Sequence, residues 1–533
     1  MRKAGVLCPI FSLPANYGIG TFGKSAYEFV DALQAAGQSF WQILPLGQTG
    51  YGDSPYQSFS TFAGNPYFID LEMLIEEGLL TKEECDKADL FDRADWIEYE
   101  KLYYNRYPLL KKAYARFDET KEEKYAKFLK KNRFWLDDYA LYMAVKDSFG
   151  GLPFTAWDRD IRLRKKKAVE KYKKDLEKEM KFYEFLQFEF DRQWKKLKKY
   201  ANKKGVAIIG DIPIYVAFDS ADTWSDPKLF QLDDNLVPLG VAGCPPDAFS
   251  ATGQLWGNPL YDWKYHKKTG YAWWMKRMAF CFELYDVVRI DHFRGFESYY
   301  SIPYGDPTAE FGHWEQGPGL DLFICMKKKL GPQSVIAEDL GFLTDEVRNM
   351  VKKTGYPGMK ITEFAFYGYE ESEYLPHKYN KNCVVYTGTH DNETAAGWAK
   401  SLSKADREFA KEYLGIRRDM DIPDGLIAMS MMSIADTAII PVQDYLGLGN
   451  EARINEPSTI GDDWRWRMTE GLSDECVAKI YALTKRSFRL PEKLFAKEVK
   501  AEAKKRKAAD KATAKKTKKK AEKPEEKKVK KED

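Results

Sequence analysis

The stretch Asp286-Val287-Val288-Arg289-Ile290-Asp291 is a short apolar run that ends in an acid. Three other runs share this pattern, at residues 206–211, 335–338 and 384–391. Short β-branched runs of this kind are typical of buried parallel strands. Carboxylates at the C-terminal ends of such strands meet in one pocket if the strands close into a barrel. Paired carboxylates in one pocket are the groups that carry out glycosidic bond chemistry.

Helix and strand signals alternate along most of the rest of the chain. Further strands are predicted at 39–46, which we expect to be the first of the barrel, and at 359–364 and 437–442. Predicted helices lie between the strands, at 24–36, 271–285, 320–330, 345–354 and about 405–414. The alternation predicts an α/β fold with a parallel β/α architecture.

Three segments depart from this alternation. Residues 71–202 are charged and aromatic with few strand signals, which predicts a mainly helical insertion beside the barrel. Residues 240–259 form an irregular segment rich in Gly and Pro just before the Asp291 strand, where a lid over a functional site is typical. Residues 497–533 are Lys-rich and poor in large apolar side chains, which predicts a disordered, solvated tail after a catalytic domain of residues 1–496.

Charge is unevenly distributed over the 533 residues. The formal net charge is +3, but the tail alone holds 17 Lys and Arg against 8 Asp and Glu. The rest of the chain is therefore mildly acidic, which argues against nucleic-acid binding by the folded body.

The cysteines and apolar segments indicate the cellular context. The seven cysteines are scattered without CxxC pairs, which favours a reducing cytoplasm over a disulfide framework or a zinc site. The N-terminus has too short an apolar stretch for a signal peptide, and no apolar run approaches the length of a transmembrane helix. We expect a cytoplasmic protein without a membrane partner, and its oligomeric state stays open.

Charged and aromatic neighbours make the strand-end acids more specific. Only five histidines occur in the chain, and two of them, His292 and His390, adjoin Asp291 and Asp391. Strand alternation places Arg289 on the same side as Asp291, where its charge keeps that carboxylate ionised, as a nucleophile requires. Retaining glycosyl transfer uses one such carboxylate and one carboxyl group with a raised pKa.

Other chemistries lack their motifs. The acids and histidines show no HExxH and no spacing diagnostic of zinc. No GxSxG nucleophile motif and no phosphate-binding glycine loop in a strand–helix context occur. We therefore predict no metal and no diffusible cofactor, because carboxylates alone can carry out this reaction.

Several stretches resemble a known family. Residues 288–295 (VRIDHFRG), 336–341 (IAEDLG) and 387–392 (TGTHDN) look like the signatures of the 4-α-glucanotransferases, glycoside hydrolase family 77. Residues 41–46 (WQILPL), 50–56 (GYGDSPY) and 211–216 (DIPIYV) match the same family. The resemblance runs from about residue 5 to about residue 490 and leaves only the tail outside.

This resemblance implies a (β/α)8 TIM barrel with inserted helical subdomains and no C-terminal β-sandwich. It implies transfer of an α-1,4-glucan segment from a donor to the 4-hydroxyl of another glucan or glucose, with maltodextrin, amylose or glycogen-derived oligosaccharides as substrates. By motif match, Asp291 is the nucleophile, Glu338 the general acid/base and Asp391 the transition-state stabiliser. The resemblance also implies substrate contacts by Ser54, Tyr56, Asp211, Trp256, Arg289, His292 and His390.

Two alternatives to transfer remain open on the residues alone. A mainly hydrolytic α-glucan enzyme uses the same acids, and a catalytically inactive glucan-binding protein could retain them. The choice of transfer over hydrolysis comes from the resemblance, since water and a sugar hydroxyl can both take the covalent intermediate. A lid that excludes water favours the sugar, and residues 240–259 are the candidate for it.

Overall fold

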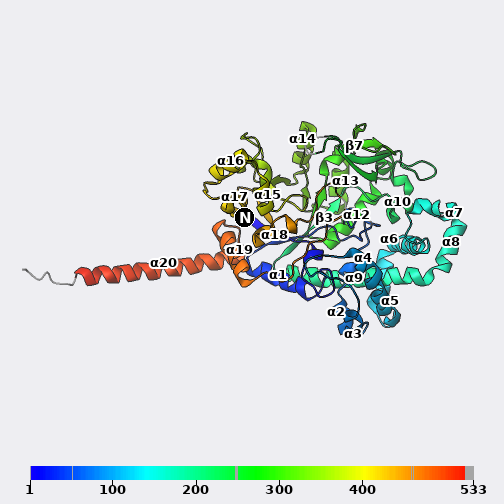
Figure 1. The fold of residues 1–533 in the computed structure, drawn as a ribbon, viewed down its shortest axis with the longest axis horizontal. Helices are drawn as coiled ribbons and strands as arrows, with labels where there is room; N and C mark the ends of the chain where they lie inside the picture. Colours follow the sequence, from blue (N-terminus) through cyan, green and yellow to red (C-terminus); the bar gives the residue numbers. More distant parts are fainter. Residues whose placement is uncertain are drawn as a thin grey trace, which may run out of the picture.

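Eight parallel strands form the central sheet of the protein (Figure 1). The structure is a computed structural model, and it describes residues 2–50, 52–246, 250–341, 343–457, 459 and 461–521. In spatial order the strands are β10 (Gly358–Ile361), β11 (Cys383–Tyr386), β12 (Thr437–Pro441), β1 (Lys3–Leu7), β2 (Phe40–Gln42), β3 (Ala207–Pro213), β6 (Val287–Asp291) and β9 (Val335–Ala337). The N–H of Ala337 in β9 donates to the carbonyl of Pro357 just before β10, at 3.0 Å. The sheet therefore nearly closes on itself, which confirms the predicted (β/α)8 barrel.

The inside of the barrel is filled by buried apolar side chains from seven of the strands, and Val287 of β6 packs against them. Strand β11 is buried along its whole length, as the near-continuous apolar runs predict. The interior cluster consists of Leu7, Phe40, Ile209, Ile336, Met359, Ile361, Val384, Tyr386 and Ile439. This packed core holds the strand ends in fixed positions, so side chains that follow the strands are held rigidly at one edge.

Helices cover the outside of the barrel and follow the sequence periodicity. Helices α13 (Leu320–Leu330) and α14 (Asp345–Thr354) have the predicted bounds. Helices α1 (Lys24–Ala35), α12 (Ala272–Leu284) and α16 (Lys404–Leu414) agree with the prediction to within one residue at each end. In α14 the Thr344 side chain caps the first turn and Gly355 adopts a left-handed conformation after the last turn.

The prediction of the first barrel strand was wrong. The barrel begins with β1, and the predicted strand at 39–46 is the shorter second strand β2. The five residues of β1 include Gly5, which weakens the strand signal. A Cβ atom at Gly5 would lie 2.6 Å from the Cβ of Phe40, so the close approach of β1 to β2 requires glycine.

The segment 240–259 is also more regular than predicted. It contains β4 (Gly240–Cys244) and β5 (Gln254–Pro259), which join β7 (Ser298–Pro303) and β8 (His313–Gln316) in an antiparallel sheet of order β5-β4-β7-β8. Gly243 weakens the strand signal of β4 in the sequence. Glycine is required at this position because a Cβ atom would lie 2.1 Å from the carbonyl oxygen of Gln254. Residues 247–249 of the predicted lid lie outside the described residues.

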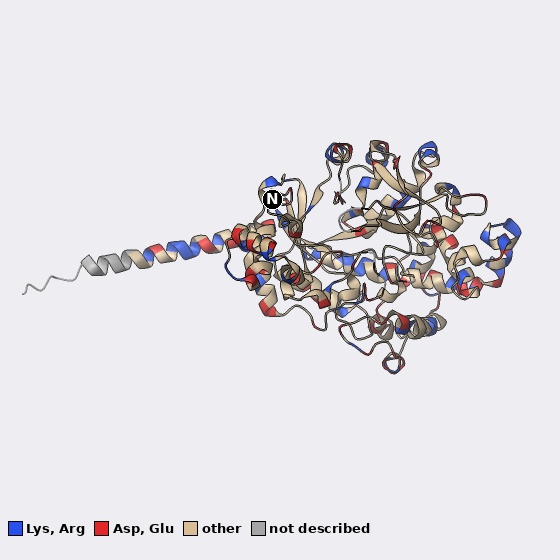
Figure 2. Ribbon diagram, turned by 45° about the horizontal axis from the view of Figure 1, so that its top comes forward, with Lys and Arg blue, Asp and Glu red and all other residues tan. Residues whose placement is uncertain are grey.

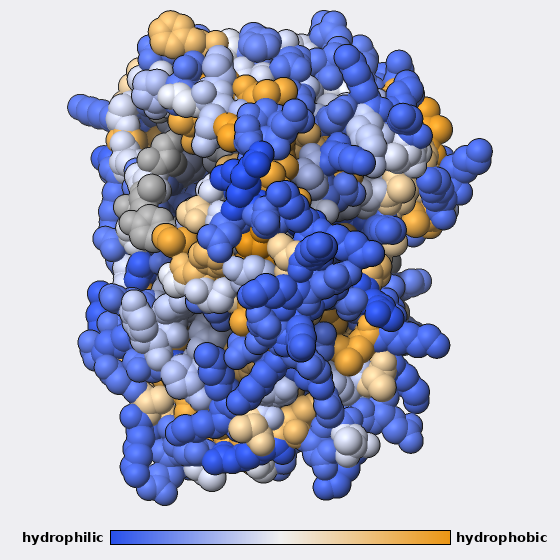
Figure 3. Space-filling model, turned by 90° about the vertical axis from the view of Figure 1, so that its right-hand side faces the viewer, coloured by the Kyte–Doolittle hydropathy of each residue, from blue (hydrophilic) through white to orange (hydrophobic). Residues whose placement is uncertain are grey.

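The segment 71–202 is mainly helical, as predicted. Its longest helices, α6 (Glu123–Ser148) and α9 (Glu177–Lys203), pack against each other. The shorter elements are α2 (Leu71–Glu76), α3 (Lys82–Asp86), α4 (Tyr99–Lys101), α5 (Tyr107–Arg116), α7 (Arg159–Arg162) and α8 (Lys166–Asp175). Figure 3 shows that the face carrying α7 and α8 is mainly hydrophilic, with apolar side chains in small groups.

Helix α9 fastens the insertion to the barrel. The side chain of Gln187 accepts from the N–H of Gly64 at 2.7 Å and donates to its carbonyl at 2.9 Å. Gln193 accepts from the N–H of Asp70 at 2.7 Å, and the buried indole of Trp194 donates to the carbonyl of Leu284 at 3.1 Å. These bonds fix the segment that follows the loop after β2.

The C-terminal tail differs from the prediction of disorder over part of its length. Helix α20 (Glu492–Ala521) extends away from the body (Figure 1). Its sequence is rich in Ala, Lys and Glu, which are strong helix formers, so it is helical without burying an apolar face. Residues 522–533 lie outside the described residues. Among the described residues, no helix is both long and apolar enough to cross a membrane.

Candidate active site

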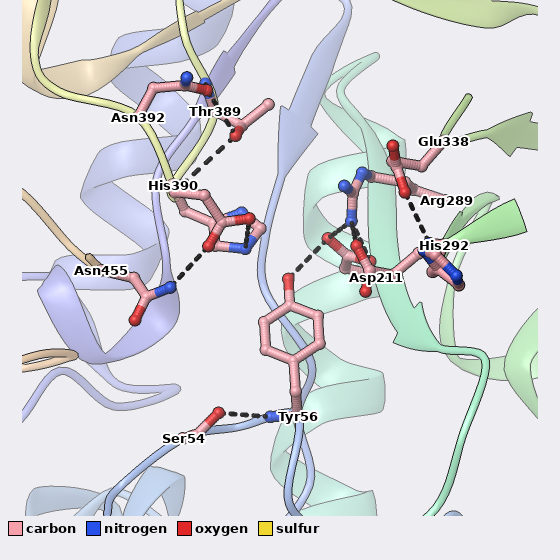
Figure 4. Close-up of polar contacts among 12 residues, drawn as sticks. Ser54, Tyr56, Asp211, Arg289, His292, Glu338, Thr389, His390, Asn392 and Asn455 are labelled. Atoms are coloured by element: carbon pink, nitrogen blue, oxygen red, sulfur yellow. Dashed lines mark hydrogen bonds and ion pairs between the residues drawn. The ribbon is translucent and has the colours of Figure 1, made fainter. Parts of the chain in front are cut away.

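The C-terminal ends of the barrel strands bring the predicted site residues together (Figure 4). Asp211 lies in β3, Asp291 ends β6, and Glu338 directly follows β9. Asp391 lies in the loop that follows β11. The side chains of Asp291 and Asp391 are 29% and 38% exposed, so a ligand can reach both.

Arg289 links two of these carboxylates. In the parallel pairing of β3 with β6, Asp211 stands opposite Arg289. Nη1 of Arg289 lies 2.8 and 2.6 Å from the two oxygens of Asp211 and 3.0 Å from Oδ1 of Asp291. Arg289 and Asp211 are fully buried. One guanidinium therefore fixes both acids, as the alternation along β6 predicted for Asp291.

Glu338 is held by backbone donors. The Glu338 N–H donates to the carbonyl of Ile290 at 3.1 Å, which places Glu338 beside the end of β6. Its Oε2 accepts from the N–H of His292 and its Oε1 from the N–H of Leu340, both at 2.7 Å. His292 itself adopts a left-handed conformation with φ of 51°. The carboxyl group is therefore oriented by the backbone that follows Asp291.

The electrostatic environment separates Glu338 from Asp291. Burial and then the neighbouring charge of Asp291 raise the pKa of Glu338 to about 8. Burial also raises the pKa of Asp291, but Asp291 has the direct contact with Arg289 that Glu338 lacks. The side chain of Asp291 is also partly exposed to solvent, which stabilises its charged form. The contact with Arg289 therefore favours the negative charge on Asp291, and the raised pKa favours the proton on Glu338.

Asp391 is held by residues that the sequence analysis missed. Nδ2 of Asn455 donates to Oδ1 of Asp391 at 2.6 Å, and Nη2 of Arg453 donates to its main-chain carbonyl at 2.8 Å. The turn before it is closed by Asn392, whose side-chain oxygen accepts from the N–H of Thr389 at 2.8 Å (Figure 4). Asn455 and Arg453 lie outside any strand-end pattern, so the sequence offers no local signal for them.

Tyr56 and His390 form a stacked pair at the centre of the site. Their rings lie 5.2 Å apart with an interplanar angle of 15°. The Tyr56 hydroxyl donates to Asp211 at 3.0 Å, and the Tyr56 N–H donates to Oγ of Ser54 at 3.3 Å (Figure 4). Burial and then Arg289 lower the pKa of His390 to about 3. The ring is therefore neutral, and its Nε2 lies 3.2 Å from Oδ2 of Asp391.

Trp256 lies over the other histidine. Its ring meets the ring of His292 edge-on, with centroids 4.7 Å apart and an interplanar angle of 87°. Burial and then Arg294 lower the pKa of His292 to about 3, so this ring is also neutral. Asn258 in the same strand donates to the carbonyl of Val216 at 2.7 Å and accepts from Gln57 at 3.2 Å. Strand β5 is therefore tied to the loop that carries Tyr56.

All ten predicted site residues occur in this one region of the molecule. The arrangement offers a carboxylate in contact with an arginine, a second carboxyl group with a raised pKa, and a third acid that a ligand can reach. This is the set of groups that retaining glycosyl transfer requires. Among the described residues, no group of three or more His, Cys, Asp or Glu is arranged to hold a metal ion. The absence of a metal requirement stays a prediction.

Comparisons with known proteins identify relatives of the whole body. A family model described as 4-alpha-glucanotransferase, glycoside hydrolase family 77, matches residues 8–473. The 4-alpha-glucanotransferase of Clostridium butyricum is 52% identical over 479 residues, which cover 89% of this chain and 98% of that protein. The 4-alpha-glucanotransferase of Thermus thermophilus is 44% identical over 501 residues, covering 92% of this chain and 99% of that protein.

A solved structure has the same fold. The amylomaltase from Streptococcus agalactiae, in complex with acarbose, superimposes with a TM-score of 0.90 at 40% sequence identity. The match covers 92% of this chain and 100% of that chain. The family model ends at residue 473, before α20 begins.

Proposed function

Because the chain belongs to the 4-alpha-glucanotransferase family, glycoside hydrolase family 77, and transfers glucan segments, we propose which of its residues carry out the transfer and on which substrates. The family assignment favours transfer over the two alternatives of hydrolysis and binding without catalysis. The observation that supports the residue roles is the pair at the ends of β6 and β9. Asp291 contacts Arg289, whereas Glu338 has a pKa raised to about 8.

In the first step, an oxygen of Asp291 attacks the anomeric carbon of the donor glucan. The bond from that carbon to the glycosidic oxygen breaks, and Glu338 gives its proton to the departing oxygen. The reducing-end part of the donor leaves, and the remaining segment is bound covalently to Asp291 as a glycosyl ester. Glu338 is then a carboxylate.

In the second step, the 4-hydroxyl of an acceptor glucan or glucose occupies the vacated place. Glu338 takes the proton from that hydroxyl as its oxygen attacks the anomeric carbon, and the ester bond to Asp291 breaks. Two inversions give net retention of the α configuration. The enzyme returns to its starting protonation state, so no cofactor is needed.

The remaining site residues bind and orient the donor sugar. Asp391, held by Asn455, accepts hydrogen bonds from sugar hydroxyls and stabilises the positive charge that develops on the ring. Asp211, Arg289, His292 and His390 surround the reacting glucose, with both histidines acting as neutral hydrogen-bonding groups. Ser54, Tyr56 and Trp256 line the path of the chain.

Neutral α-1,4-glucans are the substrates that these groups fit. We infer maltodextrin, amylose or glycogen-derived oligosaccharides as donors, and glucans or glucose as acceptors. A solved relative is in complex with acarbose, which supports a sugar chain in this site. The seven cysteines are all free, which supports the inference of a reducing cytoplasm.

Product analysis on maltotriose tests the proposed function. We expect a ladder of longer oligosaccharides together with glucose, because the acceptor hydroxyl competes successfully with water for the glycosyl ester. Thin-layer chromatography or mass spectrometry of the time course measures this. Release of glucose and maltose without any product longer than maltotriose would contradict transfer.

The loop between β4 and β5 is proposed as the lid that favours transfer over hydrolysis. Strand β5, which follows the loop, is anchored through Asn258, and Trp256 in the same strand lies edge-on to His292. We expect replacement of residues 246–251 by Gly-Gly to raise the ratio of hydrolysis to transfer by about tenfold, because water then reaches the ester. The ratio of free glucose to oligomers longer than maltotriose measures this.

A matched control lies at the other end of the same sheet. Gly240 pairs with Pro303, so Tyr304, which is 52% exposed, is distant along the sheet from the loop that is shortened. Tyr304→Ser should leave the ratio unchanged. An unchanged ratio in the shortened-loop variant shows that this segment is not the lid.

A further inference from the structure

Among the described side chains, those that anchor helix α20 lie at its beginning. The hydroxyl of Tyr481 in α19 (Asp474–Arg486) donates to Glu498 at 2.7 Å, and Lys485 lies 2.6 Å from the same carboxylate. Lys485 also reaches Glu502 at 3.3 Å. Residues 503–513 are all exposed, and the helix continues to Ala521. The part after Glu502 is therefore a free-standing arm, which we call the basic arm (residues 503–521).

The basic arm and the turn before it carry dense positive charge. Residues 500–521 contain 11 Lys and Arg against two acids, and Figure 2 shows the basic residues along the described part of the helix. Lys500, Lys504, Lys507 and Lys511 are spaced by four, three and four residues, which places them on one face of the helix. The spacing continues in the sequence with Lys515 and Lys518. At 1.5 Å per residue this charged rod is about 33 Å long.

Little of the charge on residues 503–513, the part of the arm whose side chains are described, is neutralised within the protein. Among residues 503–513, the ion pair formed is that of Lys505 with Glu502, at 3.6 Å. The rest of the chain is acidic, with 73 Asp and Glu against 67 Lys and Arg before residue 497. The arm therefore presents a positive potential that the body does not, and it does so at a distance from the acidic surface.

The arm leaves the barrel at the face opposite the candidate active site. Arg489, just before α20, donates to the carbonyls of Lys3 at 2.9 Å and Ala435 at 2.9 Å. Lys3 begins β1, and Ala435 precedes β12, so Arg489 marks the N-terminal rim of the barrel. The catalytic acids lie at the C-terminal ends of the strands. A partner bound to the arm therefore leaves the path to the acids open.

We propose that the basic arm binds nucleic acid through its phosphodiester backbone, without sequence specificity. The line of lysines from Lys500 to Lys518 is about 27 Å long, most of one helical turn of a duplex, which carries a phosphate charge for every 1.7 Å of axis. Ten of the 11 basic residues are Lys, which acts as a point charge suited to phosphates rather than to bidentate base contacts.

Two other partners fit the arm less well. A membrane-surface helix needs an apolar face, but between Val499 and Val529 no apolar side chain is larger than those of Ala and Pro. The glucan substrates are neutral and offer no charge that is complementary to the arm. The arm is therefore a second binding function that is independent of the proposed sugar chemistry.

Fluorescence anisotropy with a labelled 30-base-pair duplex of mixed sequence tests this proposal on the full-length enzyme. We expect binding that weakens steeply between 50 and 200 mM salt, with a log–log slope of about −5 if five to six phosphates are neutralised. A variant that ends at Glu502 keeps the contacts with α19 and loses the arm. We expect its binding at 50 mM salt to be weaker by about 30-fold or more.

Variants with an arm of unchanged length separate the effect of its charge from the effect of its length. Replacement of Lys504, Lys507, Lys511, Lys515 and Lys518 by Gln keeps good helix formers and should reproduce the loss, whereas their replacement by Arg should retain binding. The same affinity in the truncated enzyme, or tighter binding to vesicles with 30% phosphatidylglycerol than to the duplex, would overturn the proposal. Maltotriose transfer should be unchanged by truncation, and a loss of transfer would contradict the independence of the arm.

Discussion

Asp291→Asn should lower kcat on maltotriose by on the order of 10⁴-fold or more, because an amide oxygen cannot form the glycosyl ester at a useful rate. Asn has the same shape as Asp and can still accept a hydrogen bond from Arg289, which lies 3.0 Å from the carboxylate. The loss therefore falls on the chemical step rather than on folding or sugar binding. Initial rates of glucose release, with the melting temperature as a control, measure this.

A covalent trap identifies the same residue independently. A fluorinated α-glucosyl fluoride that slows the second step should add its glucosyl mass to the peptide that contains Asp291. Asp211→Asn is the matched comparison, because Asp211 also contacts Arg289 but is fully buried and is placed among the sugar-binding groups. Retention of more than a few per cent of wild-type turnover by Asp291→Asn, or a label on another acid, would falsify the nucleophile role.

The second large effect is expected at Glu338. As a general acid it must be protonated, and burial and the charge of Asp291 raise its pKa to about 8. The activity on maltotriose should therefore be present below about pH 8 and be lost as the pH rises through that value. On the acid side, activity should be lost as Asp291 becomes protonated, at a pH above the usual pKa of an aspartate, since burial raises its pKa. A bell-shaped profile of kcat/KM tests both limbs.

Glu338→Gln should lower kcat/KM on maltotriose by on the order of 10³-fold and remove the alkaline limb. Fluoride departs without a proton, and azide attacks without a base. With α-maltosyl fluoride as donor and azide as acceptor, the variant should therefore come within about tenfold of wild type. The product should be the α-azide, which reports retention. A loss of the same size with both donors would show that Glu338 has a positioning role and not the acid/base role.

The sequence was sufficient to predict the fold class because the local strand and helix signals match the elements of the barrel. The apolar runs that end in Asp211, Asp291 and Glu338 have the length and β-branched content of buried parallel strands. Helices such as α13 and α14 follow from their periodicity and caps. The strands that were missed or misjudged contain glycine at close contacts, such as Gly5 and Gly243. Glycine is required there by a neighbour that is distant in sequence.

The residues of the candidate site likewise fall into those that the sequence indicated and those that it did not. The acids and their adjacent His and Arg lie at strand ends, so their residue types and spacing point to a carboxylate pocket. Asn455 and Arg453, which hold Asp391, come from a segment more than 60 residues away, and no sequence pattern links them. The pairing of Tyr56 with His390 likewise joins the loop after β2 to the loop after β11.

The sequence by itself determined the barrel, the presence of acids at its strand ends and the separation of a basic tail from an acidic body, since each of these depends on residue type and short-range periodicity. Only the tertiary structure determined the different electrostatic environments of Asp291 and Glu338. The difference comes from burial, which raises the pKa of Glu338, and from the 3.0 Å contact between Arg289 and Asp291. It also decided that the basic arm leaves the face opposite the acids, because Arg489 fixes α20 to the N-terminal rim of the barrel. Both results depend on contacts between residues far apart in the chain. Residue types and local spacing do not specify such contacts.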